Sequence, residues 1–96
     1  MATGCNQPDW VIFYDHTRLG SPSFVERSTL QECLDYCVIE NLQCEGVDID
    51  YNRDPVRCWP HTNPADYVDD TNLFSQPGTH SYQLITRCAN VTTACQ

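Results

Sequence analysis

The sequence is poor in basic residues. Lysine is absent, and five arginines face thirteen aspartates and glutamates, so the formal net charge is −8. An acidic surface repels nucleic acid, heparin and anionic lipid, and we expect none of them as partners. No apolar run is long enough to span a membrane, so no membrane insertion is expected. A cationic partner, a neutral glycan or a divalent cation remains open.

Catalytic motifs are also missing. The three histidines, His16, His61 and His80, are scattered and show neither triad spacing nor the spacing of zinc proteases. The cysteines do not follow a zinc-binding pattern, and the carboxylates lack an apolar pocket that would raise a pKa. We therefore predict a protein that is not an enzyme and has no resident cofactor.

What the sequence does contain is cysteine. Seven cysteines in 96 residues predict a disulfide scaffold and hence a secreted or extracellular protein. A chain this short buries a limited core, so the cross-links matter for stability. With 41% hydrophobic and 19% charged residues, the composition indicates one globular domain rather than a disordered chain.

We find no signal-peptide pattern among the first residues of the sequence, although its cysteines indicate secretion. We expect residues 1–4 to be an added, flexible start, residues 5–88 to form the domain, and residues 89–96 to form a polar tail. The chain is thus expected to be a mature fragment or one domain of a longer protein. Asn90 opens the glycosylation sequon Asn-Val-Thr, which fits the same compartment.

The pattern of apolar residues predicts one helix and several strands. Residues 28–31 have the form of a capping box, and helix-compatible residues follow to about Asn41. Strands are predicted at residues 10–14, 44–51, 56–59 and 79–88, with loops at 15–27 and 60–78. We expect a small α+β fold in which the helix packs on a mainly antiparallel sheet.

The cysteine frame, C-x3-C-x6-C-x13-C, carries a resemblance to a known family. Its segments are STLQECLDYC at residues 28–37, CEGV at 44–47, CW at 58–59 and the stretch 82–88. Together they resemble the PAN/apple domain over most of the chain. The resemblance implies a helix cradled by a curved antiparallel sheet. It also implies three disulfides, which would be Cys33–Cys58, Cys37–Cys44 and Cys5–Cys88.

Cys95 is left over in this frame. It could pair with a cysteine of a neighbouring domain, be capped, or form an intermolecular bridge that makes a homodimer. An exchange in which Cys95 replaces Cys88 as the partner of Cys5 is a further alternative.

An acidic motif suggests weak calcium binding. Asp48, Asp50, Asn52 and Asp54 match the first half of an EF-hand loop, but Arg53 and Trp59 stand where glycine and glutamate are required. The other interpretation is strand alternation, which places these side chains on a solvent-facing side. A second acidic group, Asp66, Asp69 and Asp70, would strengthen the calcium hypothesis if the two groups met in space.

Aromatic side chains near the long loop are the better binding candidates. We expect His61 and Tyr67 to be exposed there, and Tyr51 to join them if it faces away from the core. Trp59 is a further candidate for ligand binding, and the alternative is that it packs into the core or against a disulfide.

The sequence thus predicts a non-catalytic extracellular module. By resemblance, PAN/apple domains bind proteins or carbohydrates, and the basic heparin-binding loop of some members is not matched here. Our first hypothesis is protein–protein adhesion. The alternatives are a lectin-like carbohydrate-binding module and a matrix or adhesive component cross-linked through Cys95.

Overall fold

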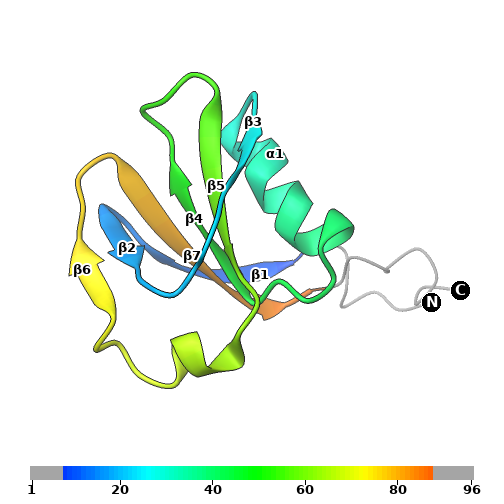
Figure 1. The fold of residues 1–96 in the computed structure, drawn as a ribbon. Coiled ribbons are helices and arrows are strands. Elements are labelled where there is room, and N and C mark those ends of the chain that lie inside the picture. The colour runs from blue at the N-terminus through cyan, green and yellow to red at the C-terminus, as the bar shows by residue number, and fades with distance from the viewer. Residues whose placement is uncertain (1–7, 88–96) are drawn as a thin grey trace, which may run out of the picture.

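The computed structural model describes residues 8–87. Five strands form an antiparallel sheet in the order β1-β7-β4-β5-β3. A second sheet of two antiparallel strands pairs β2 with β6. Helix α1 lies on one side of the large sheet, and the β2–β6 pair lies away from it on the other (Figure 1). The expected α+β architecture, with one helix on an antiparallel sheet, is confirmed.

The strands differ in how well the sequence predicted them. The predicted ones are β1 (Asp9–Phe13), β4 (Gly46–Asp50), β5 (Val56–His61) and β7 (Thr79–Thr86). The ones that the sequence did not predict are β2 (His16–Arg18), β3 (Val25–Arg27) and β6 (Leu73–Ser75). Each of these has three residues and lies within a segment predicted as loop, because so short a stretch shows no alternating pattern.

The helical segment begins one residue later than the sequence suggested. Thr29 is the N-cap: its hydroxyl accepts from the Glu32 backbone, and the Glu32 carboxylate accepts from the Thr29 backbone. The capping box is therefore Thr-x-x-Glu rather than Ser-x-x-Gln. Helix α1 (Leu30–Asp35) continues directly into a π-helical turn, η2 (Tyr36–Glu40). The wider turn ends at Glu40, and Asn41 is its C-cap, close to the end that the sequence suggested.

Two disulfides join this helical segment to the sheet. Cys33 pairs with Cys58 of β5, and Cys37 pairs with Cys44, two residues before β4. All four cysteines are fully buried. Two of the three pairings implied by the family resemblance are confirmed. Cys5 and Cys88 of the third pairing, together with Cys95 and Asn90, lie outside the described residues.

The core between helix and sheet is small and built around these bridges. Its buried members are Cys33, Cys37, Cys44, Val47, Ile49, Val56, Cys58 and Tyr82. The Arg87 guanidinium donates to the carbonyls of Cys37, Val38 and Cys44, so a fixed cation satisfies the carbonyls at the end of the helix. Among the described residues, no helix is long and apolar enough to cross a bilayer.

The two bridges close loops of different length, and we expect them to stabilise the fold unequally. The paired cysteines are 25 and 7 residues apart. Loop-closure entropy predicts that replacing Cys33 and Cys58 with alanine lowers the free energy of unfolding by about 3.5 kcal/mol. The same change at Cys37 and Cys44 should cost about 2.5 kcal/mol. Urea titration measures both. A larger loss at the shorter loop would contradict the chain-entropy explanation.

Candidate functional site: a buried charge network and the cleft above it

The side of the large sheet away from α1 is polar. In the strand register, Asp48 of β4 lies opposite Ser81 of β7 and opposite Trp59 of β5, and His61 lies opposite Gly46. Strand alternation therefore brings Asp48, Ser81 and His61 to one side. All three are buried, with relative exposures of 1%, 0% and 0%. The segments that contain Thr17, Arg18 and Asp66 lie against them, so these three side chains do not face solvent.

Asp48 accepts four hydrogen bonds from three other segments. Its Oδ1 accepts from Ser81 Oγ at 2.6 Å. Its Oδ2 lies 2.9 Å from the Arg18 backbone nitrogen, 3.2 Å from Thr17 Oγ1 and 3.0 Å from His61 Nε2. A buried carboxylate is tolerated when donors of this kind replace its hydration.

His61 joins Asp48 to the covering loop. Its second ring nitrogen, Nδ1, lies 2.7 Å from Asp66 Oδ2. A ring held between two carboxylates must donate from both nitrogens, which only the imidazolium form can do. Burial alone lowers the pKa of His61, but hydrogen bonds and charges from Asp48 and Asp66 outweigh it, so the pKa is raised above its ordinary value of 6.5.

Arg18 is the second cation of the network and is 2% exposed. Its guanidinium donates to the carbonyls of Asp66 and Asp69 and to the side chains of Asn72 and Asp70. It thereby fixes the loop that contains the short 3-10 helix η3 (Pro64–Tyr67). The guanidinium carbon lies 4.6 Å from the ring centre of Tyr67, close enough for a cation–π interaction.

Tyr67 closes the network from above. Its ring meets His61 edge to face, with centres 5.5 Å apart. Burial, followed by the charge of Asp48, raises the pKa of its phenol far above the ordinary value of 10.0. The hydroxyl lies so close to Gly46 that any Cβ at that position would collide with it. Glycine is therefore required at residue 46, and Tyr67 is held in its un-ionised form.

This burial changes several sequence predictions. The expected exposure of His61 is wrong, because two carboxylates and the covering loop enclose it. Tyr67 is half-buried rather than free in the loop. The long loop is not simply a solvated surface, since it supplies Asp66 and contacts Arg18. The two acidic groups do meet in space, but through His61, which lies between Asp48 and Asp66.

The calcium motif is divided between two environments. Asp48 faces the network with both carboxylate oxygens hydrogen-bonded, whereas the partly exposed Asp50 pairs with Arg53, three residues later in the chain. Asn52 and Asp54 are exposed. Within residues 8–87, no group of three or more His, Cys, Asp or Glu side chains has the arrangement of a metal site. The alternation of the strand explains this spacing, but the side predicted to face solvent is covered at Asp48.

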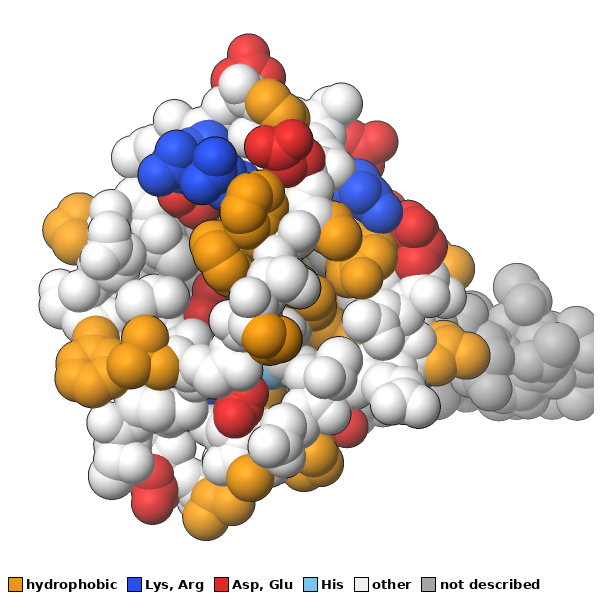
Figure 2. All heavy atoms as spheres, viewed as in Figure 1, with side chains coloured by type: hydrophobic (Ala, Val, Ile, Leu, Met, Phe, Trp, Pro, Cys, Tyr) orange, Lys and Arg blue, Asp and Glu red, His pale blue; other side chains and the backbone are white. Residues whose placement is uncertain are grey.

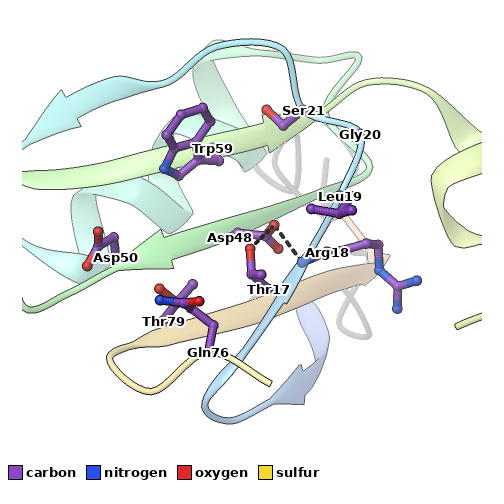
Figure 3. A pocket seen from close by; sticks show the side chains of 10 residues that line it. All are labelled: Thr17, Arg18, Leu19, Gly20, Ser21, Asp48, Asp50, Trp59, Gln76 and Thr79. Carbon is purple, nitrogen blue, oxygen red and sulfur yellow. Dashed lines mark hydrogen bonds between the residues drawn. The ribbon is translucent and has the colours of Figure 1, made fainter. Parts of the chain in front are cut away.

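A cleft of about 290 Å³ opens directly above Asp48. Its lining comes from four parts of the chain: Thr17, Arg18, Leu19, Gly20 and Ser21; Asp48 and Asp50; Trp59; and Gln76 and Thr79. Figure 3 shows Trp59 on one wall, Gln76 and Thr79 on the opposite wall, and Asp48 between them. The cleft combines an indole with several polar groups, which is typical of small binding sites.

Trp59 and Tyr51, two predicted ligand residues, lie in different places. Trp59 is half-buried and packs on Phe24, with ring centres 4.8 Å apart, so it lies away from the disulfide core. On the surface shown in Figure 2, apolar side chains gather over β5 and β3 beside acidic and basic ones. Tyr51 instead packs on His80 at 4.3 Å and donates to Asp15. The structure therefore keeps Trp59 in the cleft and separates Tyr51 from it.

The residues that sequence reasoning missed are those whose partners are distant in the chain. Arg18 and Ser81 lie 30 and 33 residues from Asp48, with which they form hydrogen bonds. Thr17 and Arg18 lay in a segment predicted as loop. The alternation of residues 79–86 indicates that Ser81 and Tyr82 point to different sides of the sheet. It does not indicate that a carboxylate lies beside Ser81 on the neighbouring strand. Only the sheet order supplies that information.

No family model matches this chain, and neither does any curated protein or solved structure. The resemblance to the PAN/apple domain therefore stays a prediction from the cysteine frame and the motifs quoted for it.

Loss of Asp48 should be strongly destabilising. In Asp48→Ala the His61 imidazolium loses one of its carboxylates, and the hydroxyl and amide donors lose their acceptor. We expect the free energy of unfolding to fall by about 3–5 kcal/mol. Asp50→Ala, on the same strand, removes only the partly exposed ion pair with Arg53 and should lower the free energy of unfolding by less than about 1 kcal/mol. Urea titration of both variants decides this, and equal losses would contradict a buried network.

The raised pKa of His61 predicts a pH-dependent stability. A group whose pKa is higher in the folded than in the unfolded state stabilises the fold fully below its unfolded pKa of 6.5. That stabilisation is lost as the pH rises through the folded pKa. Urea titrations at pH 6 to 9 should therefore show stability falling with pH, more steeply in wild type than in His61→Gln. Parallel profiles would contradict a protonated His61.

Proposed function

We propose that this chain is a non-catalytic extracellular interaction module that binds a partner protein at the Trp59 cleft. The cleft carries the proposal, because a half-exposed indole lies beside a carboxylate and several polar side chains in one concave site. Large aromatic residues dominate the energetics of protein interfaces when they are partly exposed and held in place. Phe24 holds Trp59 in this way.

The geometry of the polar network supports the absence of catalysis. Serine, histidine and aspartate are all present, but Ser81 donates to Asp48 rather than to His61. A serine nucleophile needs a neighbouring base with a free nitrogen. Both nitrogens of His61 are engaged by carboxylates, and Ser81 has an exposure of 0%. The three residues thus form a structural unit without a reachable nucleophile.

We further propose that the module is a PAN/apple domain and that it works outside the cell. Both disulfides of the helical segment have the pairing that the resemblance implies, and the helix packs on an antiparallel sheet. Buried bridges of this kind persist in oxidising compartments. A bridge between Cys5 and Cys88, a glycan on Asn90 and a homodimer through Cys95 remain predictions from the sequence.

A lectin-like function is the second candidate. The observation in its favour is that Trp59 shares its cleft with the hydroxyls of Thr17, Ser21 and Thr79. Indole rings stack on the C–H faces of sugars, and hydroxyls fix the orientation of a bound ring. A neutral sugar would satisfy both requirements.

The proposal predicts that binding depends on Trp59. Wild type and Trp59→Ser, both oxidised, are immobilised and exposed to extracellular fluid and to a glycan array. We expect wild type to retain an identifiable protein that rebinds saturably when purified, and Trp59→Ser to bind it at least tenfold more weakly. Phe74→Ser removes an aromatic ring that is 48% exposed and lies outside the cleft, and it should bind normally.

Two other results are informative. If glycans bind in a way that depends on Trp59 and no protein is retained, the cleft has the lectin-like function instead. A partner that binds Trp59→Ser as well as wild type would show that the cleft is not the binding site. Far-ultraviolet circular dichroism confirms that each variant is folded.

A further inference from the structure

The size of the cleft limits what it can hold. At about 290 Å³ it lies at the lower end of ligand-pocket volumes, so it accommodates one small group rather than an extended ligand. One side chain of a partner protein, or one sugar ring, fills such a space. The hydrogen-bonding groups of the lining then decide between these occupants.

Two hydroxyls of the lining have already committed their protons to the protein. Thr17 Oγ1 donates to Asp48 Oδ2 at 3.2 Å, and Ser21 Oγ donates to the Pro60 carbonyl at 2.6 Å. A hydroxyl has one proton and two lone pairs. Toward the cleft, both oxygens can therefore act only as acceptors.

Asp50 is the carboxylate of the lining that keeps an oxygen without a hydrogen bond to the described residues. One oxygen of the Asp50 carboxylate accepts from Arg53, and the other has no hydrogen bond to any residue in the range 8–87. The guanidinium of Arg18 points away from the cleft toward the η3 segment (Figure 3). Arg57 lies opposite Asp50 in the strand register, but its guanidinium contacts other residues. Its Nε lies 3.8 Å from Glu26 Oε2, and its guanidinium carbon lies 4.4 Å from the centre of the Phe24 ring.

From this lining we infer that the cleft receives a lysine or arginine side chain of the partner protein. An ammonium or guanidinium group brings several donors and no acceptor, which complements Asp50, Thr17 and Ser21. The neighbouring Trp59 ring adds attraction for a cation. A sugar hydroxyl brings acceptors as well as donors, and Thr17 and Ser21 have no proton left to donate to those acceptors. An anionic group would face Asp50 directly.

The net charge of the chain supports the same occupant. At −8 it attracts basic partners over a distance and repels acidic ones. Because this inference names the contact made by the partner, it rests on the proposed function of the cleft.

The test uses two short peptides that differ in one charge. Acetyl-Gly-Lys-Gly-amide and its Nε-acetyl-lysine counterpart are titrated separately into ¹⁵N-labelled oxidised protein, and the indole N–H resonance of Trp59 is followed. The same titrations are made with methyl glycosides of neutral sugars. The variants are Asp50→Asn, which removes the cleft carboxylate, and Glu26→Gln, which removes a carboxylate outside the cleft lining.

We expect the lysine peptide to shift the Trp59 resonance saturably and the acetylated peptide not to do so. Asp50→Asn should weaken binding roughly tenfold or more, and Glu26→Gln should change it by less than about twofold. Equal binding of both peptides, or an unchanged affinity in Asp50→Asn, would overturn the inference. A Trp59 shift with glycosides alone would overturn it in favour of a sugar site.

Failure of the inference and failure of the proposed function remain distinguishable. The partner retained by wild type in the previous experiment is acetylated on its lysines and, separately, blocked on its arginines. If binding still requires Trp59 but survives both treatments, the inference is wrong and the proposed function stands. If no partner requires Trp59, the proposed function itself is wrong.

Discussion

The burial of one carboxylate constrains much of this structure. Asp48 lies in the middle strand of the sheet, and a charge placed there without donors would cost several kcal/mol. Its donors come from β2, β5 and β7, which are far apart in the sequence. All of them must be in place together for the carboxylate to be tolerated. The position of the covering loop therefore depends on charge pairing more than on apolar contact.

The two sides of the sheet are consequently stabilised by different chemistry. On the side that faces the helix, two disulfides and a small apolar core stabilise the fold. On the other side, His61 and Arg18 link the sheet to residues 62–78 through carboxylates and carbonyls. A chain of this length cannot build two apolar cores, and cross-links with a satisfied polar network take the place of the second. The first side depends on the redox state, the second on pH.

The sequence predicted the elements whose pattern is local. Residues 44–51 alternate clearly. This pattern predicted strand β4 and also that Val47 and Asp48 point to different sides of the sheet. Such a pattern tells which side chains share a side of the sheet, but it does not tell what covers that side. The expectation that His61 is exposed failed at this step, because the covering loop encloses its ring. The disulfide pairing came from the family resemblance, since spacing alone leaves many pairings open. Strands β2 and β6 depend on each other across more than fifty residues, which no local pattern records.

The network and the cleft are chemically coupled. Thr17 serves both: its proton satisfies Asp48, and its lone pairs face the cleft. The requirement to stabilise a buried anion thereby fixes the direction of a hydroxyl that a ligand would meet. Arg18 acts in the same sense, because its guanidinium is held by the η3 loop and cannot neutralise the cleft. The acceptor role of Thr17 in the site thus follows from how the fold accommodates Asp48, and a change in that network would alter which ligand groups Thr17 can bind.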